Sequence, residues 1–483
     1  MKLWIKTLLM LGSIILVTAI AAGGYTMTVL NSTTKAFKTT YTQVGDKNTQ
    51  QAIQATEPLT ILLMGVDTGG AGRGTSDSWN GNSDSQILMT LNPKTHTTTM
   101  VSLERDTMTN ILDSNGKVVS TEKMNAAYPL GYNSGSDSDG LKNAVSYAMT
   151  TIGEQTGIKI DNFATVNFDG LVNMVDNVGG IDINNTTGQT LYISDTEPEY
   201  TATVEPGKQH INGDQALVYT RDRHHLPNGD YGRAAHQREV IAALMKKILA
   251  LDNITRYEQF LNEVSKDFRT NIPINTATIT SLLGYKSCFD KIVSIQYEGV
   301  GEMVNGGSYQ FMPTNIYLAM QNAMKKSLGE DTVTSLPSNL ITYETMFGSS
   351  STPFYYMPSA TVTEKGKDAV VYGIDTKGAL VKLDSSNSGK YVSTSGGSVQ
   401  SSNDTSESSE TSNTASDTTQ SDSTTLSTSD TTTNQQGTYN EGSTDYSTYQ
   451  DQSQNGGATS TYGNTSDNGA STYNNGYSTY TGQ

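Results

Sequence analysis

Apolar runs of strand length alternate with segments of helical period along the middle of the chain. The run Leu59–Val66 is almost continuously apolar, which is typical of a strand buried on both faces. Two more runs, 87–91 and 99–103, flank a short turn and predict a β-hairpin. Apolar residues recur at helical spacing from Leu141 to Ile152 and predict a helix. Strands that alternate with helices predict a layered α/β/α domain with a mixed central sheet at about 57–330.

A second set of elements is expected further along the chain. The run 165–168 predicts a short strand, after which Asp169 is placed to cap a helix that ends at Gly179 and Gly180. Residues 331–390 are expected to add a few strands. Further helices are expected at 257–267, 276–283 and 314–328, and the added strands at 369–372 and 380–383.

The stretch Ala216–Gln237 predicts a strand, a loop and the first turn of a helix. Period-two spacing places Arg221 and Arg223 on one strand face, and i, i+4 spacing places Arg233 and Gln237 on one helix face. Three guanidinium groups then converge. Such an arrangement suits a di-anion such as pyrophosphate, which arginine binds through paired hydrogen bonds.

Two alternatives stay open for this stretch. The arginines also fit a solvated strand end with surface ion pairs to Asp222 and Asp230. Leu217 and Tyr219 share the arginines' strand face, so an apolar wall adjoins the anion site if that face points inward. The apolar stripe of the following helix, Val240–Ile248, is expected to pack in the core, with a lipid pocket as the alternative.

The N-terminal residues predict a membrane segment. Leu8–Leu30 carries no charge and is long enough to span a bilayer. Lys2 and Lys6 favour a cytoplasmic N-terminus, which places the rest of the chain outside the membrane. Ala19–Ala21 also fits a signal-peptide cleavage site, but the apolar run continues beyond it and favours an uncleaved anchor.

The C-terminal residues differ in composition from the rest. Residues 391–483 contain no Lys or Arg and ten acidic residues, which supply ten of the 17 net negative charges of the chain. This low-complexity tail is expected to be disordered. The chain has no basic patch, so we expect no nucleic-acid partner. The expected organisation is 1–30 N-terminus and transmembrane anchor, 31–56 stalk, 57–330 catalytic domain, 331–390 added strands and 391–483 tail.

Polar side chains stand at the ends of the apolar strands. Asp67 follows the first strand and Arg105 follows the third, where open α/β sheets place their ligands. Asn82–Ser85 precedes the second strand, and Lys123 lies in a loop or helix start. The Gly-rich loop 69–74 lacks the Gly-Lys-Ser/Thr ending of a phosphate-binding P-loop, so it predicts only a flexible connection.

Taken in order, these segments resemble the LytR-CpsA-Psr family of Gram-positive envelope proteins. Each segment is a weak signal alone, but their order over about 57–250 is specific, and the apolar segment before them also fits. The matching segments are 65–67, 82–85, 105–106, 123–125, 166–170, 213–217, 219–223 and 230–233 with Gln237.

The resemblance implies a fold that binds polyprenyl pyrophosphate and an enzyme outside the cell membrane. Such a phosphotransferase would attach a teichoic acid or a capsular polymer to peptidoglycan through a phosphodiester. Asp67 and Asp84 would hold Mg²⁺ and, with Arg105 and Arg221, would be the catalytic residues. The residues that would bind the pyrophosphate are Arg105, Lys123, Arg221, Arg223, Arg233 and Gln237.

The chain departs from the family pattern at three positions. Asn82 replaces a usual Arg, with Arg73 as a possible substitute, Glu104 replaces a usual Pro, and His236 stands where another basic residue is common. All five histidines lack zinc-site spacing and are expected at the surface or in loops.

Alternatives to the transferase also follow from the sequence. A polyprenyl-pyrophosphate pyrophosphatase would use the same residues, and an envelope or biofilm regulator or an adhesive wall protein is also compatible. Asp67, Asp84 and Asp106 are all candidates for the general base.

Overall fold

The computed structural model describes most of the central part of the chain. The proposed anchor, the Gly-rich loop with Arg73 and nearly all of the tail lie outside the described residues. Within the described part, no helix has both the length and the apolar character needed to cross a membrane. The described residues are 40–44, 55–68, 79–136, 139–193, 201–226, 228–251, 254–273, 276–349, 355–383, 390–393 and 399–401.

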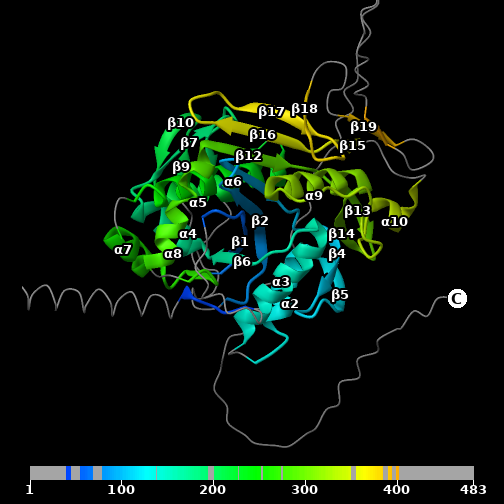
Figure 1. Cartoon of the computed structure of the whole chain (residues 1–483), viewed down its shortest axis with the longest axis horizontal. Helices are drawn as coiled ribbons and strands as arrows, with labels where there is room; N and C mark the ends of the chain where they lie inside the picture. Colours follow the sequence, from blue (N-terminus) through cyan, green and yellow to red (C-terminus); the bar gives the residue numbers. More distant parts are fainter. Residues whose placement is uncertain are drawn as a thin grey trace, which may run out of the picture. The chain divides into compact units, whose positions relative to one another are not determined.

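A mixed sheet of nine strands forms the centre of the fold (Figure 1). β1 pairs with β6, and β3 with β12, in parallel, whereas the other neighbours are antiparallel. The strands in spatial order are β11 (Phe268–Thr270), β6 (Asn162–Val166), β1 (Leu59–Val66), β2 (Ser83–Asn92), β3 (Thr97–Ser102), β12 (Lys291–Gln296), β16 (Ser359–Glu364), β17 (Val370–Ile374) and β18 (Leu380–Lys382).

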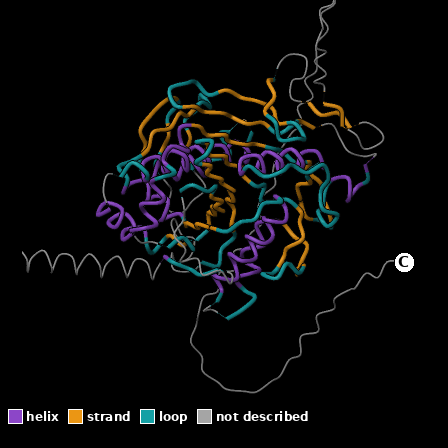
Figure 2. Tube along the Cα trace, viewed as in Figure 1, coloured by secondary structure: helices purple, strands orange, loops and turns teal. Residues whose placement is uncertain are grey.

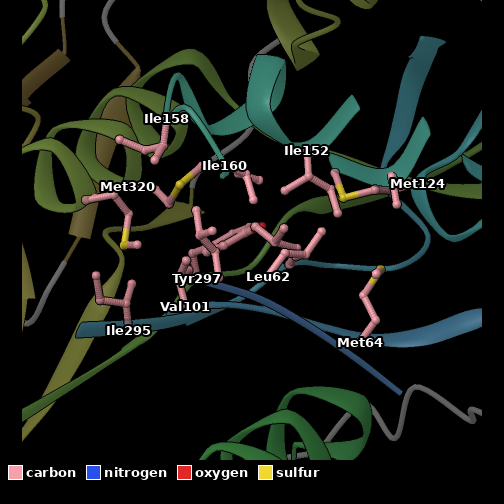
Figure 3. Close-up of a cluster of buried hydrophobic side chains, with 14 of the residues drawn as sticks. Leu62, Met64, Val101, Met124, Ile152, Ile158, Ile160, Ile295, Tyr297 and Met320 are labelled. Carbon is pink, nitrogen blue, oxygen red and sulfur yellow. The ribbon is translucent and has the colours of Figure 1, made fainter. Parts of the chain in front are cut away.

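Helices cover both faces of this sheet, so its strands lie between helices in Figure 2. Leu62 and Met64 of β1 belong to a buried cluster with α3 (Gly140–Thr156) and α9 (Thr314–Leu328), part of which is drawn in Figure 3. Ile61, on the opposite face, belongs to a second cluster that includes residues of α6 (Gly229–Ile248). Alternation of side chains along β1 therefore supplies two cores.

Smaller elements surround the sheet. The strands are β4 (Met108–Leu112), β5 (Val118–Lys123), β7 (Ile181–Asn185), β8 (Leu191–Tyr192), β9 (Thr203–Val204), β10 (Gly207–Ile211), β13 (Val300–Val304), β14 (Gly307–Phe311), β15 (Tyr355–Tyr356), β19 (Lys390–Ser393) and β20 (Val399–Ser401). The helices are α2 (Ala127–Tyr132), α4 (Phe168–Asn177), α5 (Gly213–Arg221), α7 (Ile254–Val264), α8 (Thr276–Leu283) and α10 (Tyr343–Phe347), with 3₁₀ turns at Met124–Ala126 and Lys286–Asp290.

The predicted mixed α/β fold with a large central sheet is confirmed. The hairpin predicted from 87–91 and 99–103 is the antiparallel pair β2–β3. Helices α8 and α9 have the predicted bounds, and α3 covers the predicted helix. These elements carry their signal in local periodicity, because each has one face toward a core.

The strand predicted at the start of Ala216–Gln237 is wrong, because this segment is helix α5. Asn212 caps the helix by accepting a hydrogen bond from the backbone of Gln215, whose side chain bonds back to Asn212. Ala216 to Thr220 are all buried, so the helix shows no apolar stripe that distinguishes it from a buried strand. Arg223 lies beyond the end of the helix, and its period-two relation to Arg221 was accidental.

The predicted cap at Asp169 is also wrong. Asn167 is the N-cap of α4, where its side chain accepts a hydrogen bond from the backbone N–H of Gly170. Asp169 lies in the first turn, where its charge favours the positive end of the helix dipole. The strand before this helix, β6, ends at Val166, earlier than the predicted 165–168.

Candidate functional site

Three sequence-predicted residues meet at one edge of the central sheet. Because β1 and β3 both run antiparallel to β2, both end where β2 begins. Asp67 follows β1, and its backbone N–H donates to the carbonyl oxygen of Asn82, 3.0 Å away. Arg105 follows β3, and Asp84 stands at the start of β2. The hairpin topology therefore gathers these residues from distant parts of the sequence.

A β-bulge sets the direction of Asp84. Gly65 pairs with Ser85 and Val66 pairs with Ser83, so Asp84 is the extra residue between the two pairs. Bulges of this kind redirect a side chain at the end of a strand. Ser85 faces the helix α6, where its hydroxyl donates to the side-chain oxygen of Gln237 at 2.9 Å.

Arg105 is the centre of a network of carboxylates. Its guanidinium lies 3.4 Å from Asp84, 3.5 Å from Asp106 and 3.4 Å from Asp230. Burial alone lowers the pKa of Arg105, but these carboxylates outweigh it and raise the pKa above its ordinary value. Arg105 is therefore a permanent cation held in place from several sides.

Asp230, in the first turn of α6, collects two more arginines. Arg233 lies 3.5 Å from the Asp230 carboxylate at i, i+3 spacing, and Arg223 lies 4.0 Å from it. Burial, together with the charges of Arg105 and Arg223, lowers the pKa of Arg233 despite Asp230. Arg233 is thus a largely buried cation with two other arginines nearby, and a further anion would offset the cost of its burial.

Lys123 and Asn125 complete the edge. Lys123 lies 2.8 Å from Asp106, and Asn125 donates from its side-chain amide to Asp84 at 2.9 Å. Lys123 is the last residue of β5, and Asn125 lies in the 3₁₀ segment Met124–Ala126 that follows it. Lys123 is thereby linked to Arg105 through Asp106.

An apolar cavity of about 270 Å³ begins beside this network. Its polar lining residues include Ser85, Arg221 and Gln237, which lie at the edge of the sheet where the network stands. Gln237 donates to the carbonyl oxygen of Thr220 at 3.1 Å, and the Arg221 guanidinium lies 4.5 Å from the centre of the Phe168 ring. Arg221 and Gln237 therefore mark the polar end of an otherwise apolar cavity.

The cavity continues between the sheet and α6. From Ser85 its lining follows β2 to Leu91, a length of roughly 20 Å at the rise of an extended strand. The stripe Val240–Ile248 lines the opposite side, so it borders a pocket as well as packing in the core. Leu217 and Tyr219 do not line this cavity: both are buried in helix α5, so the condition for an apolar wall through them, a strand face that points inward, is not met.

Glu104 lies next to the network and carries an unusual proton affinity. Burial, followed by the charges of Asp106 and Asp230, raises the pKa of Glu104 from 4.5 to about 7. Its backbone N–H donates to the hydroxyl of Tyr297 at 3.4 Å. Glu104 thus adds little negative charge to the site below neutral pH.

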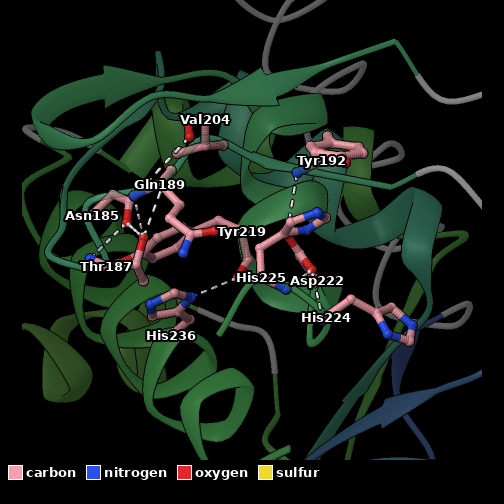
Figure 4. A network of polar contacts seen from close by, with 10 residues as sticks. All are labelled: Asn185, Thr187, Gln189, Tyr192, Val204, Tyr219, Asp222, His224, His225 and His236. Carbon is pink, nitrogen blue, oxygen red and sulfur yellow. Dashed lines mark hydrogen bonds and ion pairs between the residues drawn. The ribbon is translucent and has the colours of Figure 1, made fainter. Parts of the chain in front are cut away.

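The histidines are only partly as predicted. His96, His210 and His224 are exposed, whereas His236 is buried in α6 and contradicts the expectation of a surface or loop position. Its ring stacks on that of Tyr219 at 3.8 Å, and burial lowers its pKa to about 4 (Figure 4). His236 is therefore a neutral packing residue and supplies no positive charge to the site.

The carboxylates at this edge of the sheet fit a Mg²⁺ ion that is coordinated by both the protein and a phosphate group. The described residues contain no group of three His, Cys, Asp or Glu side chains arranged to hold a metal by themselves. Asp67 and Asp84 stand close together at the sheet edge through the pairing of β1 with β2. Mg²⁺ characteristically takes one or two carboxylates and completes its shell with phosphate oxygens and water.

Sequence reasoning gave no role to three residues of the site. Asp230 was considered only as a surface partner, yet it joins Arg105, Arg223 and Arg233. Its i, i+3 spacing to Arg233 was visible, but the helix was expected to start later. Ser85 and Asn125 were quoted in motifs, and only the fold shows that they contact Gln237 and Asp84.

Comparisons with known proteins agree with this geometry. The profile of the LytR_cpsA_psr family matches residues 26–326. Biofilm regulatory protein A of Streptococcus mutans is 40% identical over 365 residues, which cover 75% of this chain and 86% of that protein. The polyisoprenyl-teichoic acid–peptidoglycan teichoic acid transferase TagU of Enterococcus faecalis is 34% identical over 316 residues, 65% of this chain and 95% of that protein.

A solved structure has the same architecture. The crystal structure of protein gbs0355 from Streptococcus agalactiae covers 61% of this chain and 95% of its own, with 43% identity and a TM-score of 0.53. The family profile spans more than half of the chain and contains the whole edge network. The resemblance inferred from the ordered motifs is thereby confirmed, and the chain belongs to the LytR-CpsA-Psr family.

Proposed function

We propose that this chain transfers a glycopolymer of the teichoic acid or capsular type from a polyprenyl pyrophosphate carrier to peptidoglycan. The observation that carries the proposal is the apolar cavity whose polar end adjoins three arginines gathered on Asp230. A lipid pyrophosphate has the same two parts, a long apolar chain and a compact anion. The name of the Enterococcus faecalis relative, a teichoic acid transferase, supports the same reaction.

The reaction needs positioning and charge neutralisation more than covalent chemistry. An acceptor hydroxyl of peptidoglycan attacks the phosphorus that bears the polymer, and the bond from this phosphorus to the oxygen bridging the two phosphates breaks. The hydroxyl proton passes to a base, and the carrier leaves as polyprenyl phosphate. Arg105, Arg223 and Arg233 would neutralise the charge that develops on the phosphate oxygens, an effect typically worth several kcal/mol.

Asp67 and Asp84 are the residues that we assign to Mg²⁺. When bound, the ion would neutralise the pyrophosphate and help to orient it. Asn125 and Arg105, which contact Asp84, would hold that carboxylate in its place. Lys123, which contacts Asp106, and Gln237, which contacts Ser85, would bind further phosphate oxygens.

The proposed location is the outer face of the cell membrane. The support is in the sequence: an uncharged segment, Leu8–Leu30, follows Lys2 and Lys6. Peptidoglycan and a membrane-bound carrier are both available at that face. An anchored enzyme would therefore meet its two substrates without leaving the bilayer surface.

Mass spectrometry of the lipid that co-purifies with the full-length chain tests the binding part of the proposal. The wild-type chain should carry a polyprenyl phosphate or pyrophosphate, and Arg221→Ala should carry much less. Lys365→Ala is the control, because this side chain is 81% exposed and lies at a turn away from the cavity lining. A wild-type chain that neither co-purifies with nor binds added polyprenyl pyrophosphate would refute the proposal.

A transfer assay tests the chemical part. Arg221→Ala and Asp84→Ala should lose transfer of a polyprenyl-pyrophosphate-linked saccharide to peptidoglycan, whereas Lys365→Ala should keep it. Hydrolysis that is unaffected by added peptidoglycan would identify a pyrophosphatase instead. If neither variant changed lipid binding or transfer, the assignment of the site would be wrong.

A regulatory role in the envelope or in biofilms is a second candidate. It is favoured by the Streptococcus mutans relative, whose name is biofilm regulatory protein A. Such a role would be indirect, through the polymers attached to the wall. The test is complementation of a biofilm defect caused by loss of this protein. If a catalytically inactive Arg221→Ala chain fully corrects the defect, regulation does not depend on transfer.

A further inference from the structure

The carboxylate of Asp222 is buried and has four hydrogen-bond donors around it. One oxygen accepts from the backbone N–H groups of His224 and His225, at 3.0 and 3.3 Å. The other accepts from the backbone N–H of Tyr192 at 3.2 Å and contacts the ring Nδ1 of His225 at 2.8 Å (Figure 4). The side chain is only 1% exposed. Both oxygens are thus fully used inside the protein.

This carboxylate stands between two arginines of the site but contacts neither through any ion pair found among the described residues. Arg221 is the last residue of α5 and lines the cavity, and Arg223 follows Asp222 and pairs with Asp230. Asp222 itself leaves the helix in an extended conformation, with φ −60° and ψ 129°. The direction of the chain at Asp222, directly after the helix end that carries Arg221, therefore sets where Arg223 lies.

The contacts of Asp222 tie this turn to a separate hairpin. Tyr192 belongs to β8, which pairs with β9, and its ring lies 4.1 Å from the ring of His225. The loop between α5 and α6 is thus held from within by Asp222 and from the side by Tyr192. Because both carboxylate oxygens are already occupied by the loop backbone, Tyr192 and His225, they are less available to the arginines than those of Asp230.

A second Asp–His pair in the chain provides a contrast. Asp182 and His210 lie 2.7 Å apart, nearly the same distance as in the buried pair, but their side chains are 75% and 52% exposed. They join β7 to β10 and belong to no part of the edge network. Exposed ion pairs contribute little to stability, whereas removal of one partner of a buried pair has large effects.

We propose that Asp222 is a positioning residue of the anion site, whose buried carboxylate fixes the turn that leads from Arg221, at the end of α5, to Arg223. The inference rests on the proposed function, because it assigns Asp222 to the recognition of a pyrophosphate group. It acts through the arginines and does not touch the anion. Asp222→Asn keeps the size of the side chain and one acceptor oxygen but loses the charge opposite His225.

The test measures binding of inorganic pyrophosphate to the full-length chain by calorimetry. Asp222→Asn should bind about tenfold more weakly, as expected when an arginine loses one well-placed charge-assisted contact. Asp182→Asn, the matched control, should bind as the wild type does. Thermal unfolding of each variant checks that the chains are folded, and His225→Gln provides a second variant that alters the same contact from the other side.

A double-mutant cycle separates positioning from general stability. If Asp222 acts through Arg223, then Asp222→Asn should weaken binding much less in an Arg223→Ala background than in the wild type. Equal weakening in both backgrounds, or wild-type affinity in Asp222→Asn and His225→Gln, would overturn the inference while leaving the proposed function intact. A wild-type chain that binds neither pyrophosphate nor polyprenyl pyrophosphate would overturn both.

Discussion

The two faces of the central sheet are packed differently. On one face, Ala144 and Ala148 of α3 are fully buried in a cluster that also contains Leu62 and Met64 of β1. On the other face, α6 leaves a cavity of about 270 Å³ that is lined mostly by apolar side chains. Protein interiors normally contain few voids larger than a water molecule. The first face is a filled core, whereas the core of the second face borders a cavity.

The free energy attached to this difference is large. At about 24 cal/mol for each Å³, an enclosed void of 270 Å³ would cost on the order of 6 kcal/mol, which is an upper bound for a cavity that is partly open. This is comparable to the whole stability of many domains, which is roughly 5–15 kcal/mol. A cavity that lowers stability is consistent with the proposed role of this space in holding the lipid carrier.

The largest effect on the transfer rate is expected at the polar end of the cavity. Arg105→Ala removes the cation shared by Asp84, Asp106 and Asp230 and should lower the transfer rate about 100- to 1000-fold. Arg105→Lys, which keeps the charge but loses the planar fork, should give an intermediate rate. A folded Arg105→Ala chain with a near wild-type transfer rate would show that the carboxylate network at the end of the cavity takes no part in the reaction.

A matched pair of isoleucines compares the faces directly. Ile152→Ala on α3 should lower the free energy of unfolding by about 2–5 kcal/mol, because this side chain is fully buried in the filled core. Ile241→Ala on α6 should cost less stability, because its side chain already borders the cavity. Urea unfolding measures both. Equal losses would mean that the two faces are packed alike.

A large side chain that fills the cavity should weaken lipid binding without lowering stability. Ile241→Trp places a large apolar side chain in the cavity and should weaken binding of polyprenyl phosphate about tenfold, the equivalent of roughly two CH₂ groups kept out. The melting temperature should stay the same or rise, since a void is removed. Unchanged lipid affinity in this variant would place the lipid elsewhere.

The smallest effect is expected in the pH dependence of stability. The pKa of Glu104 is about 7 in the folded chain against an ordinary 4.5, so the folded state binds this proton more tightly. The resulting stabilisation is complete below pH 4.5 and is lost as the pH rises through about 7. Glu104→Gln should lack this loss, which we expect to be about 1 kcal/mol for a half-buried group. Urea unfolding of both chains at pH 5 and pH 8 measures this loss. If the unfolding midpoint changed equally with pH in the variant and the wild type, the expectation would be wrong.

Local pattern predicted what depends on local pattern. β1, α3, α8 and α9 each have a regular arrangement of apolar residues, and all four were found near the predicted bounds. Helix α5 was missed because it is buried on nearly every side, which removes the period that distinguishes a helix from a strand.

The site could be predicted only as a set of residues. The motif residues Arg223 and Arg233 do come together, but they do so on Asp230, and Arg221 joins the cavity from a helix and not from a strand. The apolar stripe Val240–Ile248 left a lipid pocket open as an alternative, but the sequence could not decide it, because the volume of the cavity depends on the distance between α6 and the sheet. That distance is a property of the whole packing.

The pairing of three arginines with Asp230 has a consequence for turnover. An entering anion must compete with Asp230 for the three arginines, so binding exchanges a carboxylate partner for the phosphate oxygens of the ligand. A pyrophosphate linkage has oxygens on two phosphates, so it can contact several of the three arginines at once. The spent carrier would bear a single phosphate of similar total charge and would reach fewer of them. Selection of the loaded carrier and release of the spent one would then both depend on how many arginines the anion can contact.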